Sequence, residues 1–177
     1  MDPHVNLETI SIGLLIMRVV IGILMAAHGA QKLLGWFGGY GLRNTGEFMV
    51  QLGFPSGPAF AAAAALAEIT SGLLVTFGFL GPIGPALMIS VMIVAMITVH
   101  WDNGLFAMKN GIELPLVFAS AALGIALIGF GRYSLDAALG IDTRFRPAIT
   151  AIVLAVGILG GFVNAAIRRK PAGKAGA

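Results

Sequence analysis

Residues 18–41 read RVVIGILMAAHGAQKLLGWFGGYG, the end of a long apolar segment followed by a loop of glycines and aromatic residues. Three ionisable residues, Arg18, His28 and Lys32, interrupt this otherwise lipid-compatible run. A charged side chain at the centre of a membrane helix costs roughly 3 kcal/mol, so such residues usually face other helices or a cavity. The stretch therefore predicts a transmembrane helix with one polar side that faces the protein interior.

The periodicity of this segment supports that prediction. At about 100° per residue, one third of the helix circumference collects its small and polar side chains, namely Arg18, Gly22, Met25, His28, Gly29 and Lys32. His28 and Lys32 are four residues apart, so their side chains are neighbours on consecutive turns.

The composition indicates a membrane protein. Of 177 residues, 58% are hydrophobic and 11% are charged, against about 25% charged residues in an ordinary soluble domain. The net charge of +3 comes from basic residues that flank apolar segments, so topology and anionic lipid explain it better than nucleic acid does. Cysteine is absent, which excludes dithiol chemistry, disulfides and iron–sulfur ligation by this chain. A redox role would require a bound cofactor or a partner protein.

The apolar runs predict one all-α bundle of five membrane spans, at about residues 10–34, 58–80, 82–100, 114–130 and 147–167. A polar leader at residues 1–9 precedes them and a basic tail at 168–177 follows. The leader is acidic and the first run is long, so we expect this run to be retained rather than cleaved as a signal peptide. The loop 35–57 is expected to lie on the membrane and to contain a short helix that starts at Thr45, and Ser134 is expected to cap another short helix.

Five spans place the two ends of the chain on opposite membrane faces. One face then carries three basic residues, Arg132, Arg144 and Arg146, and the other carries seven, Lys32, Arg43, Lys109, Arg168, Arg169, Lys170 and Lys174. The positive-inside rule favours an N-terminus outside the cell and a C-terminus in the cytoplasm.

The remaining polar residues of the spans predict a shared polar pocket. Glu68 is the single charge of the second span and lies on a face of small residues, so we expect it to point into the bundle. An up-and-down bundle brings the end of the first span, the end of the third and the start of the fourth to one face. The predicted mouth of the pocket consists of His28, Lys32, His100, Asp102, Asn103 and Glu113, with Arg18 and Glu68 deeper and close enough to bridge.

A structural interpretation of these residues stands beside the functional one. Arg18 and Glu68 would then pair only to fix helix register, and the histidines would be structural or solvated. The signal for a metal site is weak because the sequence has neither HExxH nor CxxC spacing, so we predict none.

Several short motifs occur in order along residues 10–139. They are Arg18, His28-Gly29, Lys32-Leu33, Leu52-Gly53-Phe54-Pro55, Glu68, Gly72, Phe77-Gly78, His100, Asn103-Gly104-Leu105-Phe106, Asn110-Gly111, Glu113 and the run GFGRYSLD at 129–136. With these motifs the chain resembles the DoxX family of small bacterial integral membrane proteins. The resemblance implies a four-helix core in the cell inner membrane, from which the span at 147–167 departs. It also implies association with membrane oxidoreductases, since the family takes its name from association with a thiosulfate:quinone oxidoreductase, but it provides no catalytic motif.

Three functional hypotheses follow. The first is an accessory or quinone-interacting subunit of a membrane-associated oxidoreductase system, in which histidine donates to a quinone carbonyl and lysine offsets developing negative charge. The second is a non-catalytic scaffold or assembly factor for other membrane proteins, of the kind that distant eukaryotic relatives of the family resemble. The third is a small-solute or proton pathway along the ionisable residues. The sequence leaves open the substrate, the partner, the oligomeric state and whether any catalysis occurs.

Overall fold

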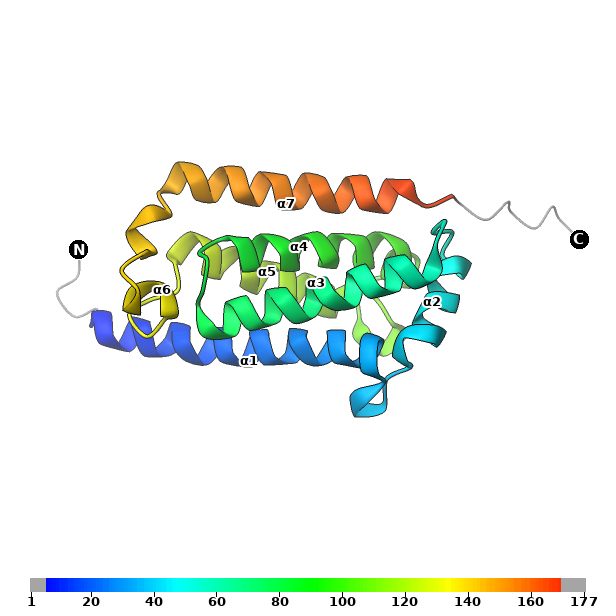
Figure 1. The fold of residues 1–177 in the computed structure, drawn as a ribbon, viewed down its shortest axis with the longest axis horizontal. Helices are drawn as coiled ribbons and strands as arrows, with labels where there is room; N and C mark the ends of the chain where they lie inside the picture. Colours follow the sequence, from blue (N-terminus) through cyan, green and yellow to red (C-terminus); the bar gives the residue numbers. More distant parts are fainter. Residues whose placement is uncertain (1–5, 170–177) are drawn as a thin grey trace, which may run out of the picture.

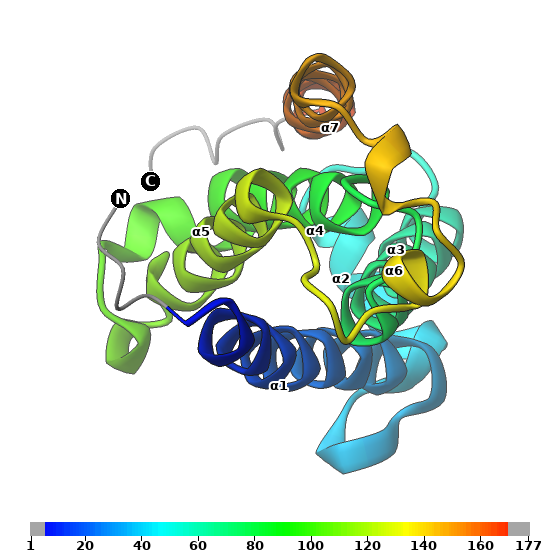
Figure 2. The same cartoon turned by 90° about the vertical axis from the view of Figure 1, so that its left-hand side faces the viewer.

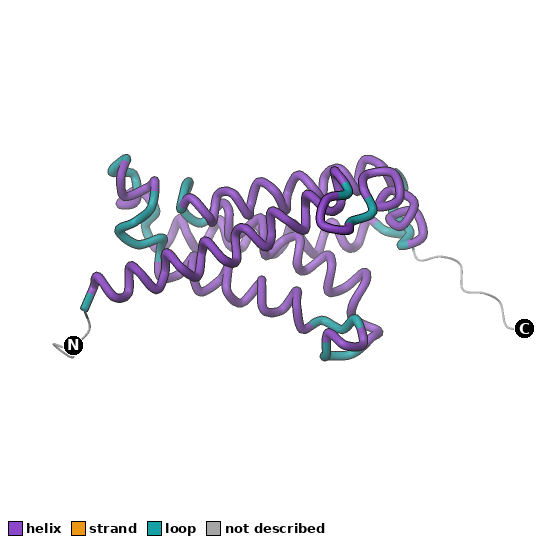
Figure 3. The backbone as a smooth tube through the Cα atoms, turned by 90° about the horizontal axis from the view of Figure 1, so that it is seen from below, coloured by secondary structure: helices purple, strands orange, loops and turns teal. Residues whose placement is uncertain are grey.

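A computed structural model describes residues 6–169, and this part of the chain contains helices but no strands (Figure 1). The long helices are α1 (Leu7–Leu34), α3 (Gly57–Phe77), α4 (Ile83–Ala95), α5 (Glu113–Ile128) and α7 (Pro147–Ile167). The shorter ones are η1 (Trp36–Gly38), α2 (Gly41–Gln51), η2 (Met96–His100), η3 (Trp101–Asn103), η4 (Ala107–Lys109), α6 (Leu135–Ala138) and η5 (Asp142–Arg144). A short turn joins α3 to α4, and longer connections that contain the short helices join the other long helices at the ends of the bundle (Figure 3). Residues 1–5 of the expected leader and residues 170–177 of the expected basic tail lie outside the described part.

Local capping sets the ends of α1. The side chain of Asn6 accepts a hydrogen bond from the amide of Glu8, and Gly35 closes the helix in the left-handed conformation with φ of 73°. Asn is a favoured N-cap and glycine a favoured residue after the last turn. The helix therefore starts at Leu7, three residues before the span expected from residue 10. Its 28 residues span about 42 Å, more than the hydrocarbon core of about 30 Å.

Glycines bring α1 and α3 into close contact. A Cβ atom added to Gly29 would lie 2.5 Å from the carbonyl oxygen of Ala65, and one added to Gly22 would lie 2.5 Å from that of Gly72. Small residues allow backbones of membrane helices to approach in this way. The predicted small-residue faces of both spans are confirmed, because they are the buried faces of these two helices.

α4 occupies the middle of the bundle and packs against α3, α5 and α7. The end view shows α7 on the outside of α4, away from α1 (Figure 2). The core contains Met25, Met88, Phe118, Ile125 and Leu154, which come from all of α1, α4, α5 and α7. A Cβ on Gly157 of α7 would lie 2.5 Å from the carbonyl oxygen of Ala86, so α7 uses the same close contact as α1.

The outer surface of the bundle is apolar. Leucine, isoleucine, valine and phenylalanine side chains on the outward sides of the long helices are exposed by 40% or more. Four helical segments have the length and composition to cross a membrane, at Leu7–Leu34, Gly57–Phe77, Ile83–Asn103 and Pro147–Ile167. α5 has 16 residues, or about 24 Å, and is shorter than these. The chain is a membrane protein with several apolar helices.

The connections differ from the expectations in detail. α2 starts at Gly41 rather than at Thr45, and Thr45 is not a cap but a buried residue whose hydroxyl donates to the carbonyl oxygen of Lys32 at 3.4 Å. The third span ends in a π-helical turn, η2, at His100. The predicted cap of α6 is confirmed, since the hydroxyl of Ser134 accepts from the amide of Ala137 at 3.2 Å. The start of α1 and the end of α7 lie at opposite ends of the bundle (Figure 1).

Candidate functional site

Lys32 and Glu68 form an ion pair between α1 and α3. The ammonium nitrogen of Lys32 lies 2.5 Å from each carboxylate oxygen of Glu68. The Glu68 side chain is 3% exposed and the Lys32 side chain 32% exposed. The prediction that Glu68 points into the bundle is therefore confirmed. The ammonium group of Lys32 compensates the negative charge of the Glu68 carboxylate. Lys32 reaches Glu68 because α1 and α3 are antiparallel and their glycine contacts bring the backbones together.

His28 lies one turn before Lys32 and turns toward α5. Its Nδ1 is 3.1 Å from the side-chain oxygen of Gln31, and its ring packs edge-on against Phe118 with ring centroids 5.7 Å apart. The ring is partly buried. No hydrogen bond involves Nε2 within the described residues, so this nitrogen is the free polar atom of the group.

Arg18 does not join this group, and the expectation that it bridges to Glu68 is wrong. Its Nη1 donates to the carbonyl oxygen of Thr76 at 3.1 Å, and its Nη2 donates to the carbonyl oxygen of Tyr133. The side chain is 1% exposed, and its Nε has no hydrogen-bond partner. α1 and α3 are antiparallel, so residue 18 is level with the end of α3, whereas Glu68 is level with residues near His28. Arg18 therefore joins α1, α3 and the loop before α6.

His100, Asn103 and Glu113 organise the connection between α4 and α5. His100 Nδ1 lies 2.7 Å from the carbonyl oxygen of Asn110, and the Asn103 amide donates to the same oxygen at 3.2 Å. The carboxylate of Glu113 accepts from the amide of Ala107 at 2.7 Å. These side chains satisfy backbone groups of a connection that contains only the short helical turns η3 and η4, which is a structural role. Asp102, in the same loop, is exposed.

The predicted polar pocket thus divides into separate groups within residues 6–169. Lys32 and Glu68 form an ion pair beside His28, the residues His100, Asn103 and Glu113 hold a loop, and Arg18 binds backbone at the far end of α3. No hydrogen bond or ion pair joins these groups in the described part of the chain. None of the eight residues predicted for the polar pocket, Asp102 included, lines either of the two pockets described for the structure.

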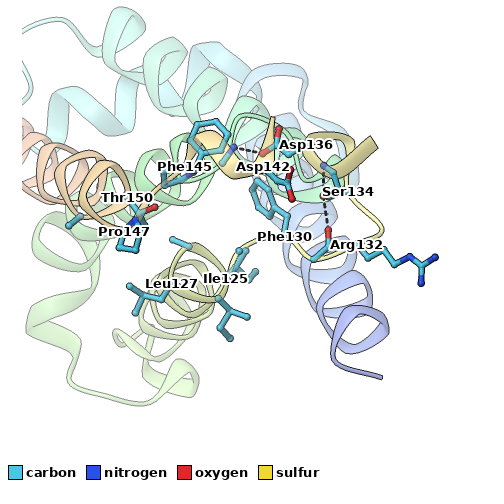
Figure 4. A pocket seen from close by; sticks show the side chains of 18 residues that line it. Ile125, Leu127, Phe130, Arg132, Ser134, Asp136, Asp142, Phe145, Pro147 and Thr150 are labelled. Carbon is cyan, nitrogen blue, oxygen red and sulfur yellow. Dashed lines mark hydrogen bonds between the residues drawn. The ribbon is translucent and has the colours of Figure 1, made fainter. Parts of the chain in front are cut away.

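The larger pocket lies at the opposite end of the bundle, where α5 ends and α7 begins. It has a volume of about 470 Å³ and is surrounded by the turn between α3 and α4, the loop 129–136, η5 and the starts of α6 and α7 (Figure 4). Its walls include Phe130, Phe145 and Ile125, with Asp136 and Thr150 as buried polar residues. The second pocket, of about 110 Å³, lies between α3, α4 and α7 and includes Asn164.

The sequence analysis gave the run 129–136 only as a family motif and did not predict the larger pocket that this run lines. Asp136 is 2% exposed, and its carboxylate accepts from the amides of Leu80 at 2.9 Å and Gly81 at 2.7 Å. In the sequence, Asp136 is marked only as an acidic residue just after the Ser134 cap, and this position does not indicate that it binds the turn between α3 and α4. Thr150 lies in the first turns of an apolar helix, and nothing in the sequence around it indicates a pocket.

The described residues contain no group of three or more histidine, cysteine, aspartate or glutamate side chains that could hold a metal ion. The arrangement therefore supplies hydrogen-bond donors, acceptors and one ion pair, but within residues 6–169 no cluster of metal ligands.

Comparison with known proteins gives one result. The family model of DoxX matches residues 13–101, a range that contains most of α1 and all of α2, α3, α4 and the π-helical turn that follows. Searches of curated proteins and of solved structures find no match. The matched range covers half of the chain and includes the ion pair between Lys32 and Glu68, as well as Arg18 and His100. This chain belongs to the DoxX family.

Proposed function

We propose that this protein is an accessory or quinone-interacting subunit of a membrane-associated oxidoreductase system, in which the buried charges of the spans have a structural role. The observation that carries the proposal of an accessory rather than a catalytic part is that these buried charges are engaged within the protein. Glu68 is paired with Lys32, and Arg18 donates to two backbone carbonyl oxygens. Groups held in this way stabilise helix packing and are not free to exchange protons with a substrate.

The proposal includes five membrane crossings in the cell inner membrane. α5 is the short span, and its ends at Glu113 and Ile128 would lie near the two membrane surfaces. With α7 as the fifth crossing, the N-terminus faces outside and the C-terminus the cytoplasm, as the distribution of basic residues favours. Labelling of single cysteines introduced at Tyr40 and Leu139 with a membrane-impermeant maleimide tests this topology. Tyr40 is expected to react only after cell permeabilisation and Leu139 in intact cells.

Association with an oxidoreductase is tested by crosslinking in native membranes followed by affinity purification and mass spectrometry. We expect a quinone-reactive oxidoreductase among the specific products. If repeated preparations yield no oxidoreductase above an unrelated membrane-protein control, the accessory role is refuted.

The quinone interaction has its own test. Purified protein is extracted and the extract is searched for quinone, with His28→Ala and His100→Ala compared with the wild type. Loss of quinone in either variant would locate the ligand at the predicted mouth. Retention in both would locate it elsewhere, and absence from all three samples would contradict the interaction.

A scaffold or assembly role is the second candidate, and the aromatic loop favours it. Trp36, Phe37 and Tyr40 are exposed by 59%, 70% and 80%, and the turn that follows α1 stands away from the other helices (Figure 1). Exposed aromatic residues at the membrane boundary suit contact with headgroups or with another membrane protein. Replacing all three with serine is expected to abolish crosslinking to a scaffolded partner and to leave the fold intact.

A proton or solute pathway gains no support, because Arg18 and Glu68 belong to separate groups. Uptake by proteoliposomes above that of empty vesicles would reinstate it.

A further inference from the structure

The pocket between α5 and α7 is built differently from the groups discussed so far, because its polar residues are not all engaged. We propose that it binds one neutral amphiphile, with a carbonyl oxygen of its headgroup hydrogen-bonded to Thr150 and its hydrocarbon chain leaving between α5 and α7. The inference rests on the proposed function only for the choice of a quinone as the first probe. The volume of about 470 Å³ lies in the range of pockets that bury small ligands.

Thr150 supplies the point of recognition. The residue is 7% exposed, and its hydroxyl makes no hydrogen bond within the described part of the chain. Buried hydroxyl groups are normally hydrogen-bonded, and an unpaired one is costly. Among the described residues, the side-chain nitrogen or oxygen that is both fully enclosed by protein atoms and without a hydrogen-bond partner is Arg18 Nε. The Thr150 oxygen is therefore not fully enclosed and is accessible from the pocket. In Figure 4 the Thr150 side chain lies at the edge of the hollow. A carbonyl oxygen in the pocket would satisfy this donor.

The charges around the pocket favour a neutral headgroup. The carboxylate of Asp136 is already bound to two backbone amides. Arg132 and Asp142 contribute one positive and one negative charge at the rim, and the Arg132 side chain points away from the hollow (Figure 4). An anionic phosphate would meet one cation and two carboxylates, so the lining offers it no net attraction.

The walls of the pocket are held in place without a ligand. Arg18 binds the carbonyl oxygen of Tyr133, and the amide of Asp136 donates to the carbonyl oxygen of Gly78 at 3.0 Å. The ring of Phe145 packs directly on Gly81, where a Cβ atom would come within 2.4 Å of the ring. Such fixed walls lower the entropic cost of binding.

The open side of the pocket is apolar. α5 and α7 both pack on α4 and make little contact with each other, as the end view also shows (Figure 2). Leu127 and Ile128 line the pocket and are exposed by 68% and 63%. These side chains face the lipid side of the bundle, so a hydrocarbon chain that leaves the pocket along them stays in an apolar environment.

The test is calorimetric titration of the full-length protein in detergent. The probes are a benzoquinone with one isoprenoid unit, short-chain phosphatidylcholine and short-chain phosphatidylglycerol. Thr150→Val removes the hydroxyl at constant shape, and Thr150→Ser retains it. Ala151→Phe fills part of the pocket, while Ala148→Phe on the same helix does not line it. Thr70→Val, at an exposed position of α3, controls for the loss of a hydroxyl elsewhere.

We expect the quinone to bind the wild type, with Thr150→Val weakening the affinity about fivefold, as for one ordinary hydrogen bond. Thr150→Ser and both control variants should stay within twofold, and Ala151→Phe should abolish binding. Phosphatidylcholine binding with the same variant pattern would identify an ester carbonyl as the acceptor and support the same site. No binding of either neutral probe, binding of phosphatidylglycerol alone, or binding unchanged in Thr150→Val and Ala151→Phe would each overturn the inference. Partner capture is independent of these results, so failure of the pocket and failure of the accessory role are distinguishable.

Discussion

Replacing Lys32 with methionine should destabilise the protein strongly, because it leaves the Glu68 carboxylate buried without a cation. Removing one partner of a buried ion pair costs about 3–5 kcal/mol. Glu68 is 3% exposed, but Lys32 is 32% exposed, so water can reach the site once the ammonium is gone. We therefore expect a loss near the lower end, about 3 kcal/mol.

The double variant Lys32→Met/Glu68→Leu separates the ion pair from ordinary packing. Replacing both partners of a buried pair with apolar residues is often neutral, so the double variant should lie within about 1 kcal/mol of the wild type. Lys109→Met is the matched control, because Lys109 is exposed in a loop, and it should change stability by less than about 0.5 kcal/mol.

The free energy of unfolding is measured by titration with sodium dodecyl sulfate in mixed micelles, followed by circular dichroism. The reasoning is refuted if Lys32→Met matches the control, or if the double variant is as unstable as the single one. The first result would mean that the carboxylate is well solvated in the folded state, and the second that the lysine stem rather than its charge stabilises the contact.

Three further variants test other parts of the structure. Gly29→Ala should destabilise the protein by about 2 kcal/mol through overpacking against α3. The control Gly124→Ala should not, because a Cβ at this position meets nothing within 4 Å. Equal unfolding curves for the two variants would contradict the close contact of α1 with α3. Asp136→Ala leaves two amides without their acceptor, at about 1–3 kcal/mol each, and should speed hydrogen exchange at the turn between α3 and α4. Arg18→Met should speed exchange in the loop around Tyr133, and protection equal to the wild type would show that this loop does not depend on the guanidinium.

The helices could be predicted from the sequence because hydrophobic periodicity and length are local properties. The inward orientation of Glu68 also followed from local pattern, since its small neighbours mark the face that packs. Its partner could not be predicted in the same way. The sequence suggested Arg18 as the partner, but the glycine contacts between α1 and α3 set a register in which Glu68 is level with residues near His28 and pairs with Lys32.

The candidate site was less predictable because loop geometry decides it. His100, Asn103 and Glu113 were correctly placed near the junction of α4 and α5, but their side chains hold that junction together. Which backbone groups of a loop lack a partner depends on its dihedral angles, as at Asn110 with φ of 59°, and these do not follow from hydropathy. The pocket around Thr150 depends on how far α5 and α7 stand apart, a tertiary property.

The packing of α7 has a consequence for the architecture of the chain. Gly157 and Gly161 lie against the backbone at Ala86 and Ser90 of α4, so α7 covers a strip of small residues that lipid chains fill poorly. A chain that ended before Pro147 would leave that strip vacant and ready to accept a helix from a neighbouring subunit. In this protein α7 covers that face of α4, so a helix of another subunit cannot pack there while α7 stays in place.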